Sequence, residues 1–110
     1  TEVRADDIRK HSELRLLAES HEAGVYIVEA VNGRQIFVLG HSEYDSDTLK
    51  KEYERDLAKG LNPDVPKHYF RNDDPSADVL VTWKAHAHLF YTNWINYYVY
   101  QTTPFQLEKL

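Results

Sequence analysis

Residues 24–40, GVYIVEAVNGRQIFVLG, contain the clearest secondary-structure signal in the chain. The β-branched and aromatic side chains at 24–31 predict one strand, and residues 34–39 (RQIFVL) predict a second. Between them, Asn32-Gly33 predicts a tight type I′ hairpin turn, whose two central residues both need a positive φ. The second run ends in four consecutive apolar residues, IFVL, which predicts that this strand is buried on both faces.

The residues on either side of the hairpin add two further elements. Residues 14–18 (LRLLA) predict a strand before it, and residues from about 47 to 59 predict a helix after it. Gly60 ends that helix at the C′ position, where the backbone turns left-handed and glycine is favoured. The candidate N-caps of the helix are Asp45, Ser46 and Asp47, and its predicted buried face consists of Leu49, Tyr53 and Leu57.

The rest of the chain divides into a loop and a long helix. Residues 61–78 contain three prolines and several Asp and Asn residues, a composition typical of an irregular surface loop. Residues 81–103 predict a helix, because large apolar side chains recur there at three- and four-residue spacing. This stripe consists of Trp83, Ala87, Phe90, Trp94, Tyr97 and Tyr98. We interpret it as core packing, in preference to stacking on a ligand.

Composition limits the classes of protein that the chain can belong to. The 110 residues allow one domain at most, and we expect 1–110 to be a single partial domain of a larger protein, since the chain has no Met and begins TEVR. A net charge of −5 and the absence of any Lys or Arg run longer than two argue against nucleic-acid binding. Residues 79–99 are too polar to cross a membrane, and no signal peptide is found, so we expect a cytoplasmic protein.

The most informative residues for chemistry are His41 and Glu43, which follow the predicted strand 34–39 and Gly40. A carboxylate that accepts a hydrogen bond from one imidazole nitrogen leaves the other nitrogen free to act as a base. The pair therefore matches two members of a nucleophile–His–acid triad, although a solvated loop pair remains the alternative. The chain has no Cys and its serines lack the context of a nucleophile elbow, so we expect the nucleophile to lie elsewhere.

The predicted helix 47–59 adds Glu52 and Arg55, three residues apart on adjacent faces. A guanidinium near a His–Glu pair can clamp a substrate carboxylate with two hydrogen bonds. The alternative is a solvated Glu52–Arg55 ion pair. His86 and His88 suggest a metal site, but residues two apart on a helix do not share a face, so we expect no metal.

Three stretches resemble the homoserine O-acyltransferases, the homoserine O-succinyltransferases and O-acetyltransferases. They are GHSEYDSDTLKKEYERDLAKGLNPDVPKHYF at 40–70, NDDP at 72–75 and WKAHAHLFYTNWINYYVYQTTPFQL at 83–107. The resemblance implies an α/β fold similar to class I glutamine amidotransferases (flavodoxin-like), with a central, mostly parallel sheet. This chain would be the C-terminal portion of that fold.

The resemblance also implies an activity and the residues that carry it. Members transfer an acetyl or succinyl group from acyl-CoA to the hydroxyl of L-homoserine in methionine biosynthesis, through a cysteine thioester and without a further cofactor. In that pattern His41 is the proton acceptor, Glu43 completes the triad, Arg55 contacts the homoserine carboxylate and Glu52 supports the site. Ser42 stands where the family commonly has proline, which leaves the backbone between His41 and Glu43 less fixed. A homo-oligomer is expected.

Two other functions remain open at this point. Glutamine amide transfer also uses a His-x-Glu pair after a strand, although the long aromatic helix 81–103 disfavours it. A non-catalytic interaction module would use the same aromatic helix to bind a partner protein.

Overall fold

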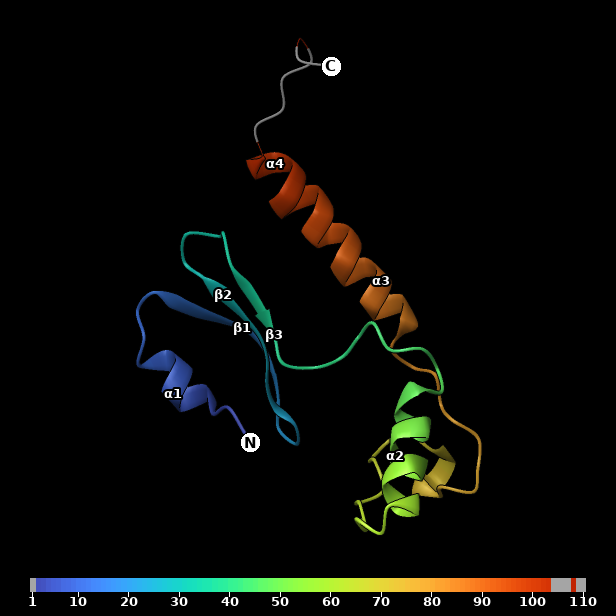
Figure 1. The fold of residues 1–110 in the computed structure, drawn as a ribbon. Coiled ribbons are helices and arrows are strands. Elements are labelled where there is room, and N and C mark those ends of the chain that lie inside the picture. The colour runs from blue at the N-terminus through green and yellow to red at the C-terminus, as the bar shows by residue number, and fades with distance from the viewer. Residues whose placement is uncertain (1, 104–107, 109–110) are drawn as a thin grey trace. The chain divides into compact units, whose positions relative to one another are not determined.

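The computed structural model describes residues 2–103 and 108 as an α/β chain that divides into two compact units. The first unit comprises residues 1–41 and 90–110, and the second comprises residues 42–89. Figure 1 shows the elements along the chain. They are α1 (Ala5–Arg9), β1 (Leu14–Ser20), β2 (Gly24–Ala30), β3 (Ile36–Val38), α2 (Thr48–Ala58), a 3-10 turn (Arg71–Asp73), α3 (Lys84–Asn93), a π-helical segment (Trp94–Val99) and α4 (Tyr100–Thr102).

The first unit is built on a three-stranded sheet in the order β1-β2-β3, with every pair antiparallel. Central strand β2 supplies the core, and its side chains of Val25, Val28 and Ala30 are buried. The strands predicted at 14–18, 24–31 and 34–39 are therefore confirmed, although β1 is longer and β3 is shorter than predicted. The mostly parallel sheet that the resemblance implies is not formed within the described residues.

The turn between β2 and β3 differs from the predicted type I′ turn. Gly33 has a φ of 71°, but Asn32 does not have a positive φ. The Gly33 N–H donates to the Ala30 carbonyl at 2.8 Å, and the Ala30 N–H donates to the Gln35 carbonyl at 2.9 Å. Asn32 instead accepts a hydrogen bond from the Arg34 N–H on its side-chain oxygen at 2.9 Å. The predicted hairpin is right and its turn type is wrong, because this side-chain bond stabilises a longer loop.

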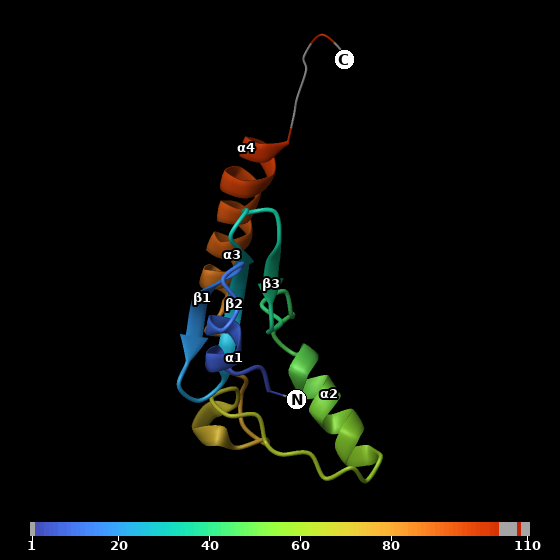
Figure 2. The same cartoon turned by 90° about the vertical axis from the view of Figure 1, so that its left-hand side faces the viewer.

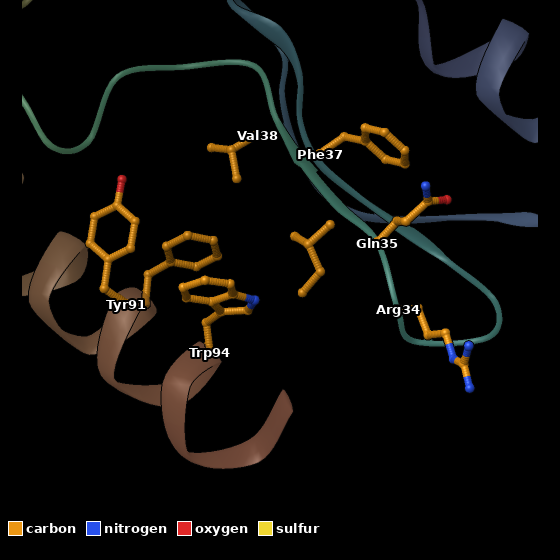
Figure 3. A pocket seen from close by; sticks show the side chains of 8 residues that line it. Arg34, Gln35, Phe37, Val38, Tyr91 and Trp94 are labelled. Carbon is orange, nitrogen blue, oxygen red and sulfur yellow. The ribbon is translucent and has the colours of Figure 1, made fainter. Parts of the chain in front are cut away.

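The prediction that the strand 34–39 is buried on both faces is also wrong for the described residues. Phe37 is 46% exposed and Leu39 is 44% exposed. Strand β3 lies at the edge of the sheet. Its successive side chains point to opposite faces of the sheet, and the two faces are covered unevenly. Figure 3 shows this alternation, with Val38 pointing toward the helix that carries Trp94 and Phe37 pointing away from it.

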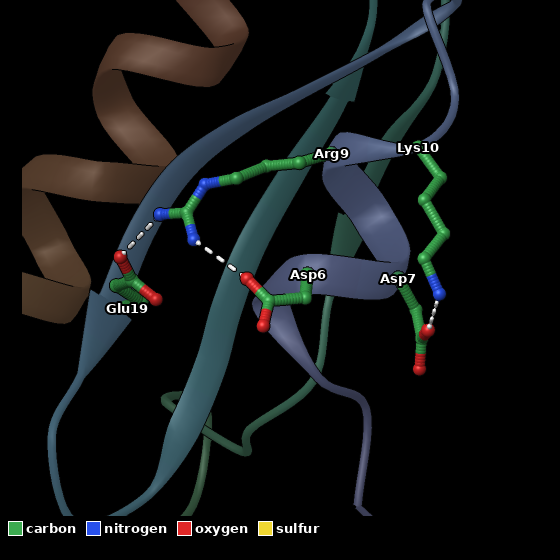
Figure 4. Close-up of polar contacts among 5 residues, drawn as sticks. All are labelled: Asp6, Asp7, Arg9, Lys10 and Glu19. Atoms are coloured by element: carbon green, nitrogen blue, oxygen red, sulfur yellow. Dashed lines mark hydrogen bonds and ion pairs between the residues drawn. The ribbon is translucent and has the colours of Figure 1, made fainter.

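Helix α1 is tied to the sheet by exposed ion pairs. Arg9 contacts Glu19 of β1 at 2.8 Å and Asp6 at 3.5 Å (Figure 4). Lys10 pairs with Asp7 at 2.9 Å within the same turn. Solvent screens such pairs, so they orient this short helix more than they stabilise the fold.

The helix predicted at 81–103 begins at Lys84 and changes to π-helical pairing from Trp94 to Val99. A π-helical turn contains more residues than an α-helical turn, so the side chains from this segment onward do not keep the α-helical spacing on which the predicted stripe was based. Ala87 is buried, but Trp94 is 42% exposed and Tyr97 is 67% exposed. Core packing is therefore wrong for these two aromatic residues of the stripe. No helix among the described residues is both long enough and apolar enough to span a bilayer.

The second unit has an aromatic core that the sequence prediction missed. Phe70 and Tyr69 lie in the predicted surface loop 61–78, yet they are only 1% and 6% exposed. Phe70 packs edge-on against Tyr53 of α2, with ring centroids 6.1 Å apart, and Tyr69 packs against Trp83 at 6.0 Å. The loop is held by a bridge between Phe70 and Val79. Figure 2 shows this segment running beside α2.

Both ends of α2 are stabilised by hydrogen bonds. At the C-terminus, Gly60 has a φ of 72°, its N–H donates to the Leu57 carbonyl at 3.0 Å, and the Leu61 N–H donates to the Asp56 carbonyl at 3.0 Å. This is a Schellman motif, and it confirms Gly60 as the C′ residue. Of the predicted buried face, Leu49 and Tyr53 are half-buried, whereas Leu57 is 45% exposed, so that part of the prediction is wrong.

At the N-terminus the predicted side-chain cap is not formed. Asp47 occupies the N-cap position but its carboxylate pairs with Lys51 at 2.7 Å. The Tyr69 hydroxyl replaces it, because it accepts a hydrogen bond from the Lys50 N–H at 3.1 Å and donates to the Ser46 carbonyl at 2.7 Å. A residue from the aromatic core therefore caps the helix that carries Glu52 and Arg55.

Candidate active site

His41 follows a closely packed end of the sheet. The Leu39 N–H donates to the Tyr26 carbonyl at 2.9 Å, which continues the β2–β3 ladder by one residue. A Cβ atom at position 40 would lie 3.0 Å from Cε2 of Tyr26. Glycine therefore lets the backbone pass close to this ring and places the exposed His41 directly after the strand.

The boundary between the two compact units falls between His41 and Ser42. His41 belongs to the first unit, whereas Glu43 belongs to the second and is exposed. The hydrogen bond between the two side chains, on which the predicted pair depends, stays a prediction.

Within the second unit, Tyr44 connects the segment after Glu43 to helix α2. Its hydroxyl donates a hydrogen bond to Oε1 of Glu52 at 3.0 Å, and both side chains are half-buried. This bond to a carboxylate is the main cause that raises the pKa of Tyr44 above its usual value, followed by desolvation. The shift favours the protonated hydroxyl, which is the form that donates to Glu52.

Arg55 does not form the ion pair with Glu52 that was the alternative to a substrate-binding role. Its Nε donates to Oδ1 of Asp56 at 2.8 Å, and this bond is the main cause that raises the pKa of Arg55. Over residues 2–103, no hydrogen bond or ion pair is made by its two terminal nitrogens. They form the planar pair of donors that binds a carboxylate.

The charges that act on the Tyr44 hydroxyl include those of three of the four predicted site residues. The negative charges of Glu52 and Glu43 both raise the pKa of the Tyr44 hydroxyl, and the positive charge of Arg55 lowers it. Glu43, Glu52 and Arg55 thus act on the same hydroxyl group. The structure therefore groups these three side chains in the second unit, around a tyrosine that the sequence analysis did not single out.

The backbone of Tyr44 is also fixed by its surroundings. Its carbonyl accepts hydrogen bonds from Nε1 of Trp83 at 3.3 Å and from Nζ of Lys84 at 3.4 Å. Trp83 in turn packs against Tyr69, which belongs to the core of this unit. The chain after Glu43 is therefore anchored at both the main chain and the side chain of Tyr44.

The described residues contain no group of three or more His, Asp or Glu side chains positioned to hold a metal ion. His86 and His88 are both exposed on α3. A groove of about 410 Å³ lies in the first unit between residues 34–38 and the helical residues 90–94, and none of the predicted site residues lines it (Figure 3).

Comparison with known proteins identifies the family. The model of the homoserine O-succinyltransferase family matches residues 1–105. The chain belongs to this family. The match therefore confirms the family resemblance that was inferred from residues 40–70 and 83–107.

Individual relatives agree with this assignment. A homoserine O-acetyltransferase of Acetivibrio thermocellus is 59% identical over 110 residues, which is the whole of this chain. Homoserine O-acetyltransferases of Bacillus cereus (strain ATCC 10987) and Bacillus anthracis (strain A0248) are 61% and 60% identical over 107 residues, or 97% of this chain. The chain spans 36% of the length of each of these relatives.

Proposed function

We propose that this chain is the part of a homoserine O-acyltransferase that supplies the histidine and the acid of a catalytic triad. The whole enzyme would transfer an acetyl or succinyl group from acyl-CoA to the hydroxyl of L-homoserine, in the cytoplasm and in methionine biosynthesis. The observation that carries this proposal is the family match over residues 1–105. The thiol would come from a polypeptide segment outside these 110 residues, because they contain no Cys.

In the first half-reaction, His41 takes the proton of the cysteine thiol, and the thiolate attacks the carbonyl carbon of acyl-CoA. The bond between that carbon and the CoA sulfur breaks, and CoA leaves after taking a proton from the His41 imidazolium. The acyl group is then held as a cysteine thioester. Throughout this step Glu43 stabilises the positive charge on the imidazolium.

In the second half-reaction, His41 takes the proton of the homoserine hydroxyl, and the resulting oxygen nucleophile attacks the thioester. The bond between the acyl carbon and the cysteine sulfur breaks, and the sulfur recovers the proton from His41. Product O-acyl homoserine leaves, and the free thiol is restored. One histidine can serve both halves because it returns to the neutral state after each.

Arg55 is the residue that we propose binds the homoserine carboxylate. Two observations support this role: its terminal nitrogens have no partner over residues 2–103, and its charge reaches the same hydroxyl as that of Glu43. Glu52 would support the site from one turn earlier on α2. The donor can be acetyl-CoA or succinyl-CoA, since the family is described by the succinyl activity and the relatives above are named for the acetyl activity.

We further propose that residues 1–110 complete a larger glutamine amidotransferase-like sheet in the whole enzyme, and that the enzyme is a homo-oligomer. The open edge of β3, with Phe37 and Leu39 exposed beside it, supports a larger sheet, because edge strands of this kind are usually paired or covered. Glutamine amide transfer and a non-catalytic interaction module are the competing functions.

One assay separates these functions. The full-length protein that contains this chain is incubated with acetyl-CoA or succinyl-CoA, and release of free CoA is followed with and without L-homoserine. The proposal predicts release that depends on L-homoserine, with O-acyl homoserine as the product, and no ammonia from L-glutamine. Ammonia release from glutamine, or no turnover of either acyl-CoA, would reject the proposal.

A further inference from the structure

Tyr44 connects Glu43, the proposed acid of the triad, to Glu52 on α2. It follows Glu43 directly in the sequence, and its hydroxyl is bonded to Glu52 on α2 at 3.0 Å. Its carbonyl is held by Trp83 at 3.3 Å. Because both ends of Tyr44 are fixed, the orientation of the Glu52 carboxylate is fixed as well.

The orientation of the Glu52 carboxylate matters because, without the bond from Tyr44, Glu52 would pair with Arg55. Residues three apart on a helix are neighbours, and a Glu followed by an Arg at this spacing forms an ion pair readily. Here Glu52 and Arg55 have that spacing, yet no ion pair joins them, and Arg55 contacts Asp56 through Nε instead. The Tyr44 hydroxyl is the hydrogen-bond donor that holds Oε1 of Glu52.

The contact with Asp56 leaves the binding end of Arg55 available. A bond through Nε occupies one edge of the guanidinium, and the two terminal nitrogens remain as a parallel pair of donors. A Glu52 carboxylate released from Tyr44 would compete for those two nitrogens. The side chain of Glu52 is half-buried and close, so this competition would be intramolecular.

We propose that Tyr44 is a positioning residue that holds the Glu52 carboxylate away from Arg55 and so keeps the Arg55 guanidinium open for the carboxylate of an amino-acid substrate. This inference rests on the proposed function for the identity of the substrate. The arrangement of the Tyr44, Glu52 and Arg55 side chains does not depend on that function.

The first test uses Tyr44→Phe in the full-length enzyme. Without the hydroxyl, Glu52 turns toward Arg55, and the KM for L-homoserine rises roughly three- to tenfold, the factor that corresponds to the usual net contribution of one intramolecular hydrogen bond. The rate of acyl-enzyme formation from acyl-CoA, measured without homoserine, stays at the parent value because Arg55 takes no part in that half-reaction. An unchanged KM for L-homoserine would overturn the proposal.

Tyr53→Phe is the matched control on the same helix. Tyr53 loses the same hydroxyl, but this hydroxyl makes no hydrogen bond over residues 2–103, and its ring packs against Phe70. The control should leave the KM for L-homoserine unchanged. An equal rise in both variants would mean that the loss of a tyrosine hydroxyl acts through stability, which would overturn the role assigned to Tyr44.

A double-mutant comparison separates this role from a general structural one. In the Glu52→Gln background the side chain at 52 is neutral and competes weakly for Arg55, so Tyr44→Phe should raise the KM for L-homoserine less there than it does in the parent background. A purely structural role predicts the same increase in both backgrounds, and that outcome would overturn the proposal.

A crystal structure of the Tyr44→Phe variant tests the arrangement without reference to activity. We expect a Glu52 oxygen within ion-pair distance of a terminal nitrogen of Arg55. Should the parent enzyme fail to acylate homoserine, the proposed function fails, while this structure still decides the inference. A Glu52 carboxylate that keeps its position in the variant would contradict it.

Discussion

Gly40 illustrates how a single residue sets the position of the candidate base. A Cβ atom there would lie 3.0 Å from Cε2 and 3.3 Å from Cδ2 of Tyr26, so any side chain would crowd the ring. Unlike Gly33, whose φ is 71°, Gly40 has no left-handed backbone to maintain. The requirement at position 40 is therefore one of space, and it acts on the residue immediately before His41.

We expect Gly40→Ala to lower the free energy of unfolding of the full-length enzyme by about 1–2 kcal/mol, the usual cost of inserting a methyl group into a packed contact. Acyl transfer should fall as well, because His41 moves with the displaced backbone. Thermal denaturation and kcat/KM measure the two effects. Replacing Tyr26 by the smaller Leu in the same protein should restore part of both, and a Gly40→Ala enzyme as stable and active as the parent would contradict the assignment.

Arg55 carries the second prediction at this scale. Arg55→Ala should raise the KM for L-homoserine on the order of tenfold or more, because two charge-assisted hydrogen bonds to the substrate carboxylate are lost. The reaction of the enzyme with acyl-CoA alone should be unaffected. Arg71→Ala is the control, since Arg71 is an exposed arginine whose side chain faces Asp78 at 3.9 Å. Equal effects of the two substitutions would remove Arg55 from the site.

Among the elements, α2 matters most for the proposed site because it carries both Glu52 and Arg55. Its first turn is capped by the hydroxyl of Tyr69, which contacts the Lys50 N–H and the Ser46 carbonyl. Tyr69→Phe should lower the free energy of unfolding by about 1–2 kcal/mol, the range for a buried hydrogen-bonded group and for a helix cap.

Hydrogen exchange gives the sharper readout for this cap. The Lys50 amide should exchange faster in Tyr69→Phe, because its acceptor is gone, whereas the amides in the last turn of α2 should keep their protection. Tyr53→Phe again serves as the control, since it removes a hydroxyl from the same aromatic cluster without removing the cap. Unchanged exchange at Lys50 in Tyr69→Phe would show that the hydroxyl is not the cap.

The elements also show which features a sequence can predict. Strand β2, the hairpin and the Gly60 terminus of α2 follow from hydrogen bonds between residues near in sequence, so local patterns predict them. Tyr69 caps a helix whose first turn lies 19 residues earlier in the chain, and no periodicity signals such a contact. No periodicity signals the bond between Tyr44 and Glu52 on α2 either. His41 and Arg55, in contrast, can be found from their residue types and their motif.

On the scale of the whole molecule, the chain leaves large apolar side chains exposed. Phe37 and Leu39 are exposed at β3, and Trp94, Tyr97 and Tyr100 are exposed along the π-helical segment and α4. The chain spans 36% of the length of its relatives. The apolar patterns in β3 and in the aromatic stripe show which side chains are apolar, but they do not show which part of the protein covers them. That is why burial was overestimated for β3 and for the aromatic stripe.

We expect residues 1–110, produced alone, to bind a hydrophobic fluorescent dye strongly, and the full-length enzyme to bind little of it per molecule. The physical reason is that the remainder of the proposed larger domain would cover these exposed apolar side chains. Dye fluorescence at equal molar concentration measures the difference. Equally weak binding by the two proteins would contradict the proposal that residues 1–110 are one part of a larger domain.

The role of His41 as the proton acceptor for a cysteine is tested most directly by intact-mass measurement of the acyl-enzyme. Full-length enzyme and its His41→Ala variant are each mixed with acyl-CoA in the absence of homoserine, with His21→Ala, an exposed histidine in the turn between β1 and β2, as the matched control. The parent and His21→Ala should gain the mass of one acyl group on a cysteine, and His41→Ala should remain unmodified over the same time. An acyl-enzyme that forms in His41→Ala at the parent rate would contradict the account.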